Sequence, residues 1–191
     1  QSESHNMFGS TSAFGGGATT GFGATSAASN FKLQDPNTNQ SYEVPQAPND
    51  SISALAWSPA FNHLAASSWD NSVRVWEVST SGVQIQAVPK FAWNHDAPAL
   101  CVCFSKDGST VFSGGCDNQL KMKNLQTQQE QVIGKHDAPI CAVFYVDEMK
   151  TIITGSWDKT VRFWNGQSPT PVATLQQPER VYCMDINYPL M

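Results

Sequence analysis

The chain has few charged side chains and no excess of positive ones. Only 14% of its 191 residues are charged, with 11 Lys and Arg against 16 Asp and Glu, which gives a net charge of −5. This balance argues against a broad cationic surface that grips a nucleic-acid backbone. The chain also lacks an apolar run near the roughly 18–20 residues that a membrane span needs, and its start lacks the pattern of a secretory signal. We therefore predict no membrane insertion.

Cysteine is also scarce, and its spacing argues against a metal site. The five cysteines are an odd number and contain no Cys-x-x-Cys pair. Cys101 and Cys103 are two residues apart, so in a strand they share one face and do not by themselves close a tetrahedral metal site. We expect all five to be reduced, as in an intracellular protein, and to serve as small packing residues. No metal and no small-molecule cofactor is expected.

What the chain does have is a twelve-residue pattern that occurs three times. Residues 153–164 read ITGSWDKTVRFW, residues 65–76 read AASSWDNSVRVW, and residues 112–123 read FSGGCDNQLKMK. Each copy runs through small residues to an Asp, turns, and leaves as an alternating strand. Such copies, at a period of about 40–45 residues, are typical of the blades of WD40 propellers. The sequence therefore predicts an all-β fold, a WD40 β-propeller with about three and a half blades present.

Two parts of the chain differ in composition. Residues 1–34 are rich in Gly, Ser, Thr and Ala and contain Phe-Gly at residues 8–9, 14–15 and 22–23. Because so few side chains there can be buried, we expect a disordered tail. Residues 35–191 are expected to form the partial propeller. Its predicted parts are a closing strand at 41–45, blades at about 51–78, 95–125 and 136–165, and the start of a fourth at 175–191.

Polar residues at fixed spacing predict a hydrogen-bonded chain inside the blades. In the third unit this chain would comprise His136, either Thr154 or Ser156, Asp158 and Trp164. The second unit has Lys123 at the Trp offset and the first has Pro48 at the His offset, so both networks are expected to be incomplete. A Ser/His/Asp set that recurs in each blade, without a nucleophile elbow, does not indicate a hydrolase. We predict no catalytic residue and no enzyme.

Four residues are candidates for contact with a partner. Trp69 and Trp157 directly precede the turn aspartates, a position near the rim of the central channel, and Trp is enriched at binding hot spots. Packing against a neighbouring blade is an equally good interpretation. Arg180 and Tyr182, where the fourth unit begins, are weaker candidates. The pair Lys121 and Lys123 could meet an acidic peptide or phosphate, but a solvated strand face is favoured.

Three segments make the family resemblance narrower. Residues 155–164, 136–139 and 175–183 resemble the Gle/Rae-type mRNA export propellers of the nuclear pore; the last, LQQPERVYC, is the most specific. Lys123-Asn124 departs from the family pattern, which more often has Trp-Asp. The resemblance covers roughly residues 35–191 and implies the N-terminal portion of a non-enzymatic, seven-bladed scaffold.

The resemblance also implies partners and a location. Such a scaffold binds a GLEBS-type helical hairpin segment of a nucleoporin, acts in nucleocytoplasmic transport of mRNA–protein particles, and is found in the nucleus, at the nuclear pore complex and envelope. RNA is a further implied partner. Most of the nucleoporin-gripping surface lies in later blades of the family. The alternative is a mitotic checkpoint adaptor that binds GLEBS-like segments of kinetochore kinases. A ubiquitin-ligase substrate receptor is a third hypothesis, but no segment resembles an F-box.

Overall fold

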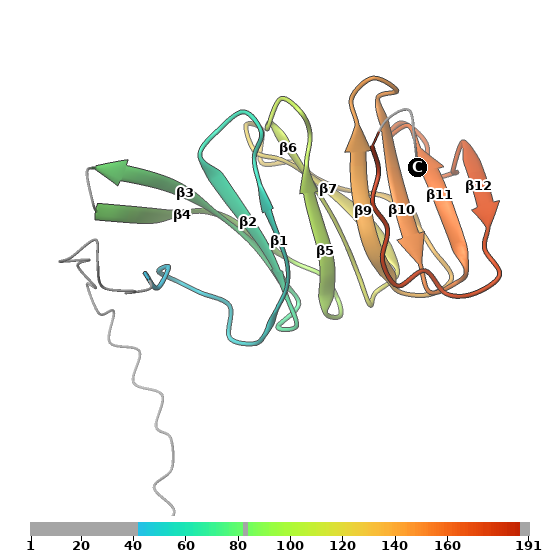
Figure 1. The fold of residues 1–191 in the computed structure, drawn as a ribbon, viewed down its shortest axis with the longest axis horizontal. Helices are drawn as coiled ribbons and strands as arrows, with labels where there is room; N and C mark the ends of the chain where they lie inside the picture. Colours follow the sequence, from blue (N-terminus) through green and yellow to red (C-terminus); the bar gives the residue numbers. More distant parts are fainter. Residues whose placement is uncertain (1–41, 82–83, 188–191) are drawn as a thin grey trace, which may run out of the picture.

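The computed structural model describes residues 42–81 and 84–187 and forms three four-stranded antiparallel sheets (Figure 1). The first sheet has the order β1-β2-β3-β4, the second β5-β6-β7-β8 and the third β12-β11-β10-β9. In the part of the chain that the structure describes, no helix has the length and apolar character needed to cross a membrane. The strands are β1 (Ile52–Trp57), β2 (His63–Ser68), β3 (Ser72–Ser81), β4 (Gln84–Asn94), β5 (Ala99–Phe104), β6 (Thr110–Gly115), β7 (Gln119–Asn124), β8 (Glu130–Lys135), β9 (Ile140–Val146), β10 (Thr151–Ser156), β11 (Thr160–Trp164) and β12 (Ala173–Gln176).

The central hairpin of each sheet turns at the aspartate that the sequence pattern marks. The residue after that aspartate adopts a left-handed conformation, with φ of 73° at Asn71, 64° at Asn118 and 68° at Lys159. Asn tolerates this conformation better than most residues, whereas Lys occupies it at a cost. Three similar turns therefore place three aspartates at corresponding ends of their sheets.

The core lies between the sheets. The first and second sheets enclose a cluster that includes Val73, Trp93 and Val111, and the second and third enclose one that includes Ile133 and Trp164. Figure 1 shows the three sheets side by side in chain order. In the second sheet, successive side chains face the two layers in turn, as period-2 geometry requires: Val111 belongs to the first cluster and Phe112 to the second.

The all-β prediction is confirmed, with three complete four-stranded sheets. The sequence-derived bounds omitted the fourth strand of each sheet, since β4, β8 and β12 begin after residues 78, 125 and 165. Leu175 and Gln176 belong to β12 rather than to a fourth unit. Residues 181–186, within the expected fourth unit, join no sheet in the described chain. Their apolar side chains instead pack on the outer face of the third sheet.

The expected closing strand is also not a strand over residues 42–45. A strand needs a backbone partner, and no described strand pairs with this segment. It is held by side chains instead, because the Tyr42 hydroxyl accepts a hydrogen bond from the Ala87 amide at 3.2 Å. Tyr42 and Val44 pack against Trp76. Ser41 and the predicted disordered tail lie outside the described residues.

Candidate partner-binding face

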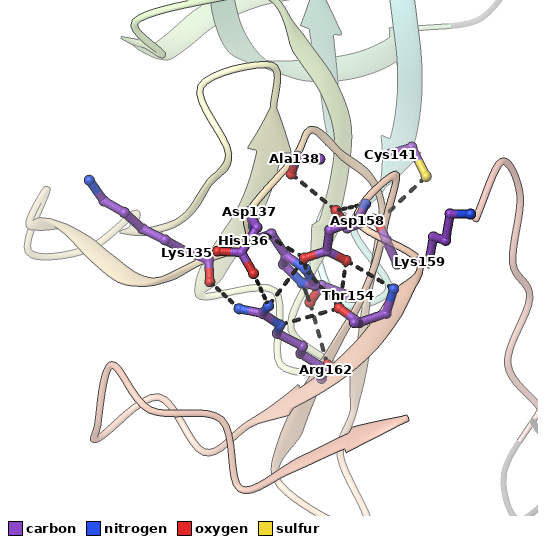
Figure 2. Close-up of polar contacts among 12 residues, drawn as sticks. Lys135, His136, Asp137, Ala138, Cys141, Thr154, Asp158, Lys159 and Arg162 are labelled. Atoms are coloured by element: carbon purple, nitrogen blue, oxygen red, sulfur yellow. Dashed lines mark hydrogen bonds and ion pairs between the residues drawn. The ribbon is translucent and has the colours of Figure 1, made fainter. Parts of the chain in front are cut away.

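The third sheet contains the complete polar network that the sequence predicts, and Figure 2 shows its members His136, Thr154 and Asp158. His136 Nδ1 lies 2.8 Å from Asp158 Oδ2, and its Nε2 lies 2.7 Å from Thr154 Oγ1. The Trp164 indole donates to the same Thr154 oxygen at 2.8 Å. Thr154, not Ser156, is therefore the hydroxyl of the network, since Ser156 donates to the Ala138 carbonyl.

The protonation of this network follows from its contacts. A neutral His136 that donates from Nδ1 to Asp158 and accepts at Nε2 from Thr154 leaves the Thr154 oxygen free to accept from Trp164. Burial lowers the pKa of His136, although Asp158 opposes the shift. Burial alone would raise the pKa of Asp158, but hydrogen bonds from Thr160, His136 and the Asp137 amide lower it to about 2. The pair is thus a neutral imidazole beside a carboxylate.

The second sheet completes its network with a tryptophan from the sheet before it. His95 Nδ1 lies 2.9 Å from Asp117 Oδ2 and its Nε2 lies 2.9 Å from Ser113 Oγ. The indole of Trp93, on β4 of the first sheet, donates to Ser113 at 3.3 Å. The prediction of an incomplete second network was wrong, because a fixed offset along β7 does not show which neighbouring strand reaches the same space. The signal in the sequence was Trp93, two residues before His95.

The first sheet satisfies its aspartate without a histidine. The Asn49 amide donates to Asp70 Oδ2 at 2.8 Å, and the Ser72 amide and hydroxyl donate to Asp70 Oδ1. Burial alone would raise the Asp70 pKa, but these hydrogen bonds lower it to about 2. The Trp76 indole donates to the Pro45 carbonyl at 2.8 Å. Backbone groups therefore replace the missing imidazole.

A basic residue four positions after each turn aspartate ties the sheet to the segment before it. Sequence reasoning missed this role, although the spacing was visible in all three units. Lys121 is only 8% exposed, and its ammonium lies 3.2 Å from Glu130. Lys121 is therefore not on a solvated strand face, and its ammonium is not free to contact an acidic ligand. The donations are Arg74 to the Gln46 carbonyl at 2.6 Å, Lys121 to that of Asn94 at 2.8 Å and Arg162 to that of Lys135 at 2.8 Å.

Trp69 and Trp157 occupy equivalent places in the first and third sheets. The Trp69 amide donates to the Ser51 carbonyl and the Trp157 amide to the Pro139 carbonyl, both at 3.0 Å. Trp69 is 46% exposed. Trp157 is partly buried, and its indole nitrogen has no hydrogen-bond partner among the described residues. Both side chains lie at the aspartate ends of their sheets, separated by the whole second sheet.

The segment that contains Arg180 and Tyr182 is hydrogen-bonded to the residue before Trp157. The Val181 amide between them donates to the Ser156 carbonyl at 3.1 Å. Arg180 is exposed, and Tyr182 is 67% exposed. Three of the four predicted contact residues therefore lie on two adjoining segments of the chain, and Trp69 lies on a different sheet. Their binding role stays a prediction.

The hydroxyl, histidine and aspartate sets of the second and third sheets act within the folded core. The hydroxyl-bearing residues Ser113 and Thr154 are fully buried, so a substrate does not reach them. Both hydroxyls also accept from a tryptophan indole. The described residues contain no group of three or more His, Cys, Asp or Glu side chains suited to a metal ion.

Comparison with known proteins places this architecture in a family. The family model for the WD domain, G-beta repeat, matches residues 39–77, 88–122 and 127–165, which is more than half of the chain. The chain belongs to the WD40 family. Each of the three WD40 matches includes one of the turn aspartates described above.

Individual relatives are close over most of this WD40 chain. It is 50% identical over 171 residues to Protein RAE1 of Arabidopsis thaliana, covering 89% of this chain and 47% of the relative. It is 43% identical over 190 residues to the mRNA export factor of Danio rerio, covering 97% and 49%. With the Poly(A)+ RNA export protein of Schizosaccharomyces pombe it shares 42% over 152 residues, covering 78% and 42%. The chain thus spans about half the length of these curated relatives.

Proposed function

We propose that this WD40 chain is a non-enzymatic scaffold in nuclear mRNA export that docks a GLEBS-type segment of a nucleoporin at the nuclear pore. The observation that carries the proposal is its 42–43% identity to relatives named as mRNA and poly(A)+ RNA export proteins. The same names favour this role over the mitotic checkpoint adaptor. RNA or an mRNA–protein particle is a further partner in this proposal.

The arrangement of Trp157, Arg180 and Tyr182 supports docking at the aspartate ends of the sheets. The exposed part of the Trp157 ring can pack against an apolar surface of a partner, whereas its indole nitrogen is buried and contributes no donor. Arg180 and Tyr182 on the adjoining segment offer a guanidinium and a phenol, which are residue types enriched at interfaces. The buried networks beneath hold these loops on rigid sheets, which limits the entropy lost on binding.

The test is calorimetric titration of a GLEBS-type nucleoporin segment into the full chain and into Trp157→Ala. We expect the wild-type chain to bind and the variant to lose about tenfold or more in affinity, as truncation of a hot-spot residue does. Trp57→Ala is the matched control, because Trp57 is 60% exposed at the end of β1 and lies on a different sheet. Thermal unfolding of each variant checks that the fold is kept.

Three results would contradict the proposal. Absence of binding to the nucleoporin segment at high micromolar concentration would show that this segment is not a partner of the chain. Equal losses for Trp157→Ala and Trp57→Ala would show that the loss is not specific to this face. Stronger binding to a GLEBS-like segment of a kinetochore kinase would favour the checkpoint adaptor instead.

A further inference from the structure

A recess lies between the second and third sheets, at the opposite ends of the strands from the turn aspartates. Its volume is about 370 Å³. Asp107, in the turn before β6, contributes to its rim, whereas Asp117 follows the other end of β6. The volume is at the lower end of the range for ligand pockets, about 300–1,000 Å³. It therefore suits one long side chain rather than a large cofactor.

The floor of the recess is aromatic and aliphatic. Phe112 and Tyr145 stack with their ring centroids 5.4 Å apart and their planes 16° apart, and Met122 and Ile152 complete the apolar lining. The Tyr145 hydroxyl forms no hydrogen bond with the described residues. Burial raises the pKa of Tyr145, so the phenol keeps its proton at neutral pH. The floor thus combines an apolar platform with one free hydroxyl.

The rim carries an unbalanced negative charge. The Asp147 carboxylate is paired with Lys150 at 2.6 Å. Asp107 has no ion-pair partner among residues 42–81 and 84–187. Its carboxylate accepts instead from the Ser105 hydroxyl at 2.5 Å and from the Ser109 hydroxyl at 2.8 Å and amide at 3.1 Å. Led by the Ser105 bond, these contacts lower the pKa of Asp107 and keep it ionised.

We propose that this recess binds an arginine or lysine side chain from a basic segment of a partner protein. The methylene stem would lie on the Phe112–Tyr145 platform, and the cationic head would meet Asp107 and the Tyr145 hydroxyl. A nucleic-acid backbone fits poorly, because its phosphates would approach the unpaired carboxylate. The site lies on the face opposite Trp157, so it does not depend on the function proposed above.

Methionine methyl groups report on this site directly. The probe is the blocked peptide Ac-Gly-Arg-Gly-NH₂, titrated into the full chain labelled with ¹³C at the methionine methyls. We expect the Met122 resonance to shift with millimolar affinity, while Met184, which packs on the outer face of the third sheet, stays unmoved. The apolar peptide Ac-Gly-Nle-Gly-NH₂ should shift Met122 much less. Raising the salt concentration to about 1 M should weaken binding of the arginine peptide, because the Debye length falls to about 3 Å.

The variants separate charge from fold. Asp107→Asn keeps the size of the side chain and should lower the affinity for the arginine peptide about threefold, which is the scale of an exposed ion pair. Glu148→Gln makes the same charge change in the neighbouring turn, outside the recess, and should leave the affinity unchanged. Three results would overturn the proposal. They are equal binding of the norleucine and arginine peptides, equal effects of the two variants on affinity, and no Met122 shift at about 20 mM arginine peptide.

Discussion

At the scale of single residues, each turn aspartate requires donors, and the chain supplies different ones in each sheet. His136 and His95 serve Asp158 and Asp117, whereas the Asn49 amide and Ser72 serve Asp70. A buried carboxylate without such partners would lower the stability of the fold, and burial would disfavour its ionised form. What recurs is therefore a satisfied carboxylate rather than one residue type.

Replacing Thr154 by Val tests the centre of the third network. Val keeps the shape but removes the oxygen that serves both His136 and Trp164, so two buried groups lose their partner. We expect the free energy of unfolding to fall by about 2–4 kcal/mol. The measurement is chemical denaturation of wild type and variant. Thr174→Val on exposed β12 is the control and should change the value by less than about 0.5 kcal/mol; a similarly small effect at Thr154 would contradict the network's importance.

At the scale of elements, neighbouring sheets are joined by side chains as well as by the apolar core. Ser53 on β1 donates to the Ala99 carbonyl of the second sheet at 2.6 Å. Cys101 on β5 donates in the same way to the Ile140 carbonyl of the third sheet at 3.6 Å. Gly134 on β8 allows close packing, since a Cβ there would lie 2.1 Å from Trp164. The sheets therefore hold a fixed register against one another.

A double-mutant cycle on Trp93 and Ser113 measures one of these joints. We expect Trp93→Phe and Ser113→Ala each to lower the free energy of unfolding, and the pair to show a coupling of about 0.5–1 kcal/mol. The reason is that the bond from the Trp93 indole to Ser113 crosses from the first sheet to the second. Denaturation of the four proteins gives the coupling. Strictly additive losses would show that the contact contributes nothing to joining the sheets.

At the scale of the whole molecule, the buried histidine and the turn aspartates give stability the same dependence on pH. The pKa of His136 is lowered by burial, so below pH 6.5 the unfolded chain binds a proton that the folded chain does not. The folded-state pKa values of Asp70 and Asp158 are about 2, against 3.8 as the ordinary value. Their contribution is present above about pH 4 and is lost as the pH falls toward 2. Both effects reduce stability on acidification.

We therefore expect the midpoint of thermal unfolding to fall between pH 7.5 and pH 5.5, and again between pH 4 and pH 2.5. The first drop reports His136 together with His63, whose pKa is also lowered by burial, and the second reports the aspartates. Scanning calorimetry at fixed ionic strength measures both. An NMR titration of the His136 ring gives an independent readout, and a midpoint at or above 6.5 would contradict the assignment.

Much of the fold could be predicted from local patterns. Alternation and the Asp-centred turns located β3, β7 and β11, and fixed spacing identified the His136 network. The outer strands β4, β8 and β12 were missed because they carry no such landmark. Trp93 was missed as a network member because the missing indole is supplied across a sheet boundary. Lys121 was misjudged because a lysine on a strand is expected to be solvated unless its carbonyl partner, here Asn94 on β4 of the preceding sheet, is known.

The sequence by itself determined the repeat, the position of each turn and the family, because these depend on residues close together along the chain. Only the tertiary structure decided that Thr154 rather than Ser156 completes the third network, that Trp93 serves the second sheet, and that the segment with Arg180 and Tyr182 is hydrogen-bonded to the residue before Trp157. It also decided that Asp107 and Tyr145 share one recess. These facts depend on which strands the packing of the sheets brings together, and the distance between two side chains across a sheet boundary is not encoded in their separation along the chain.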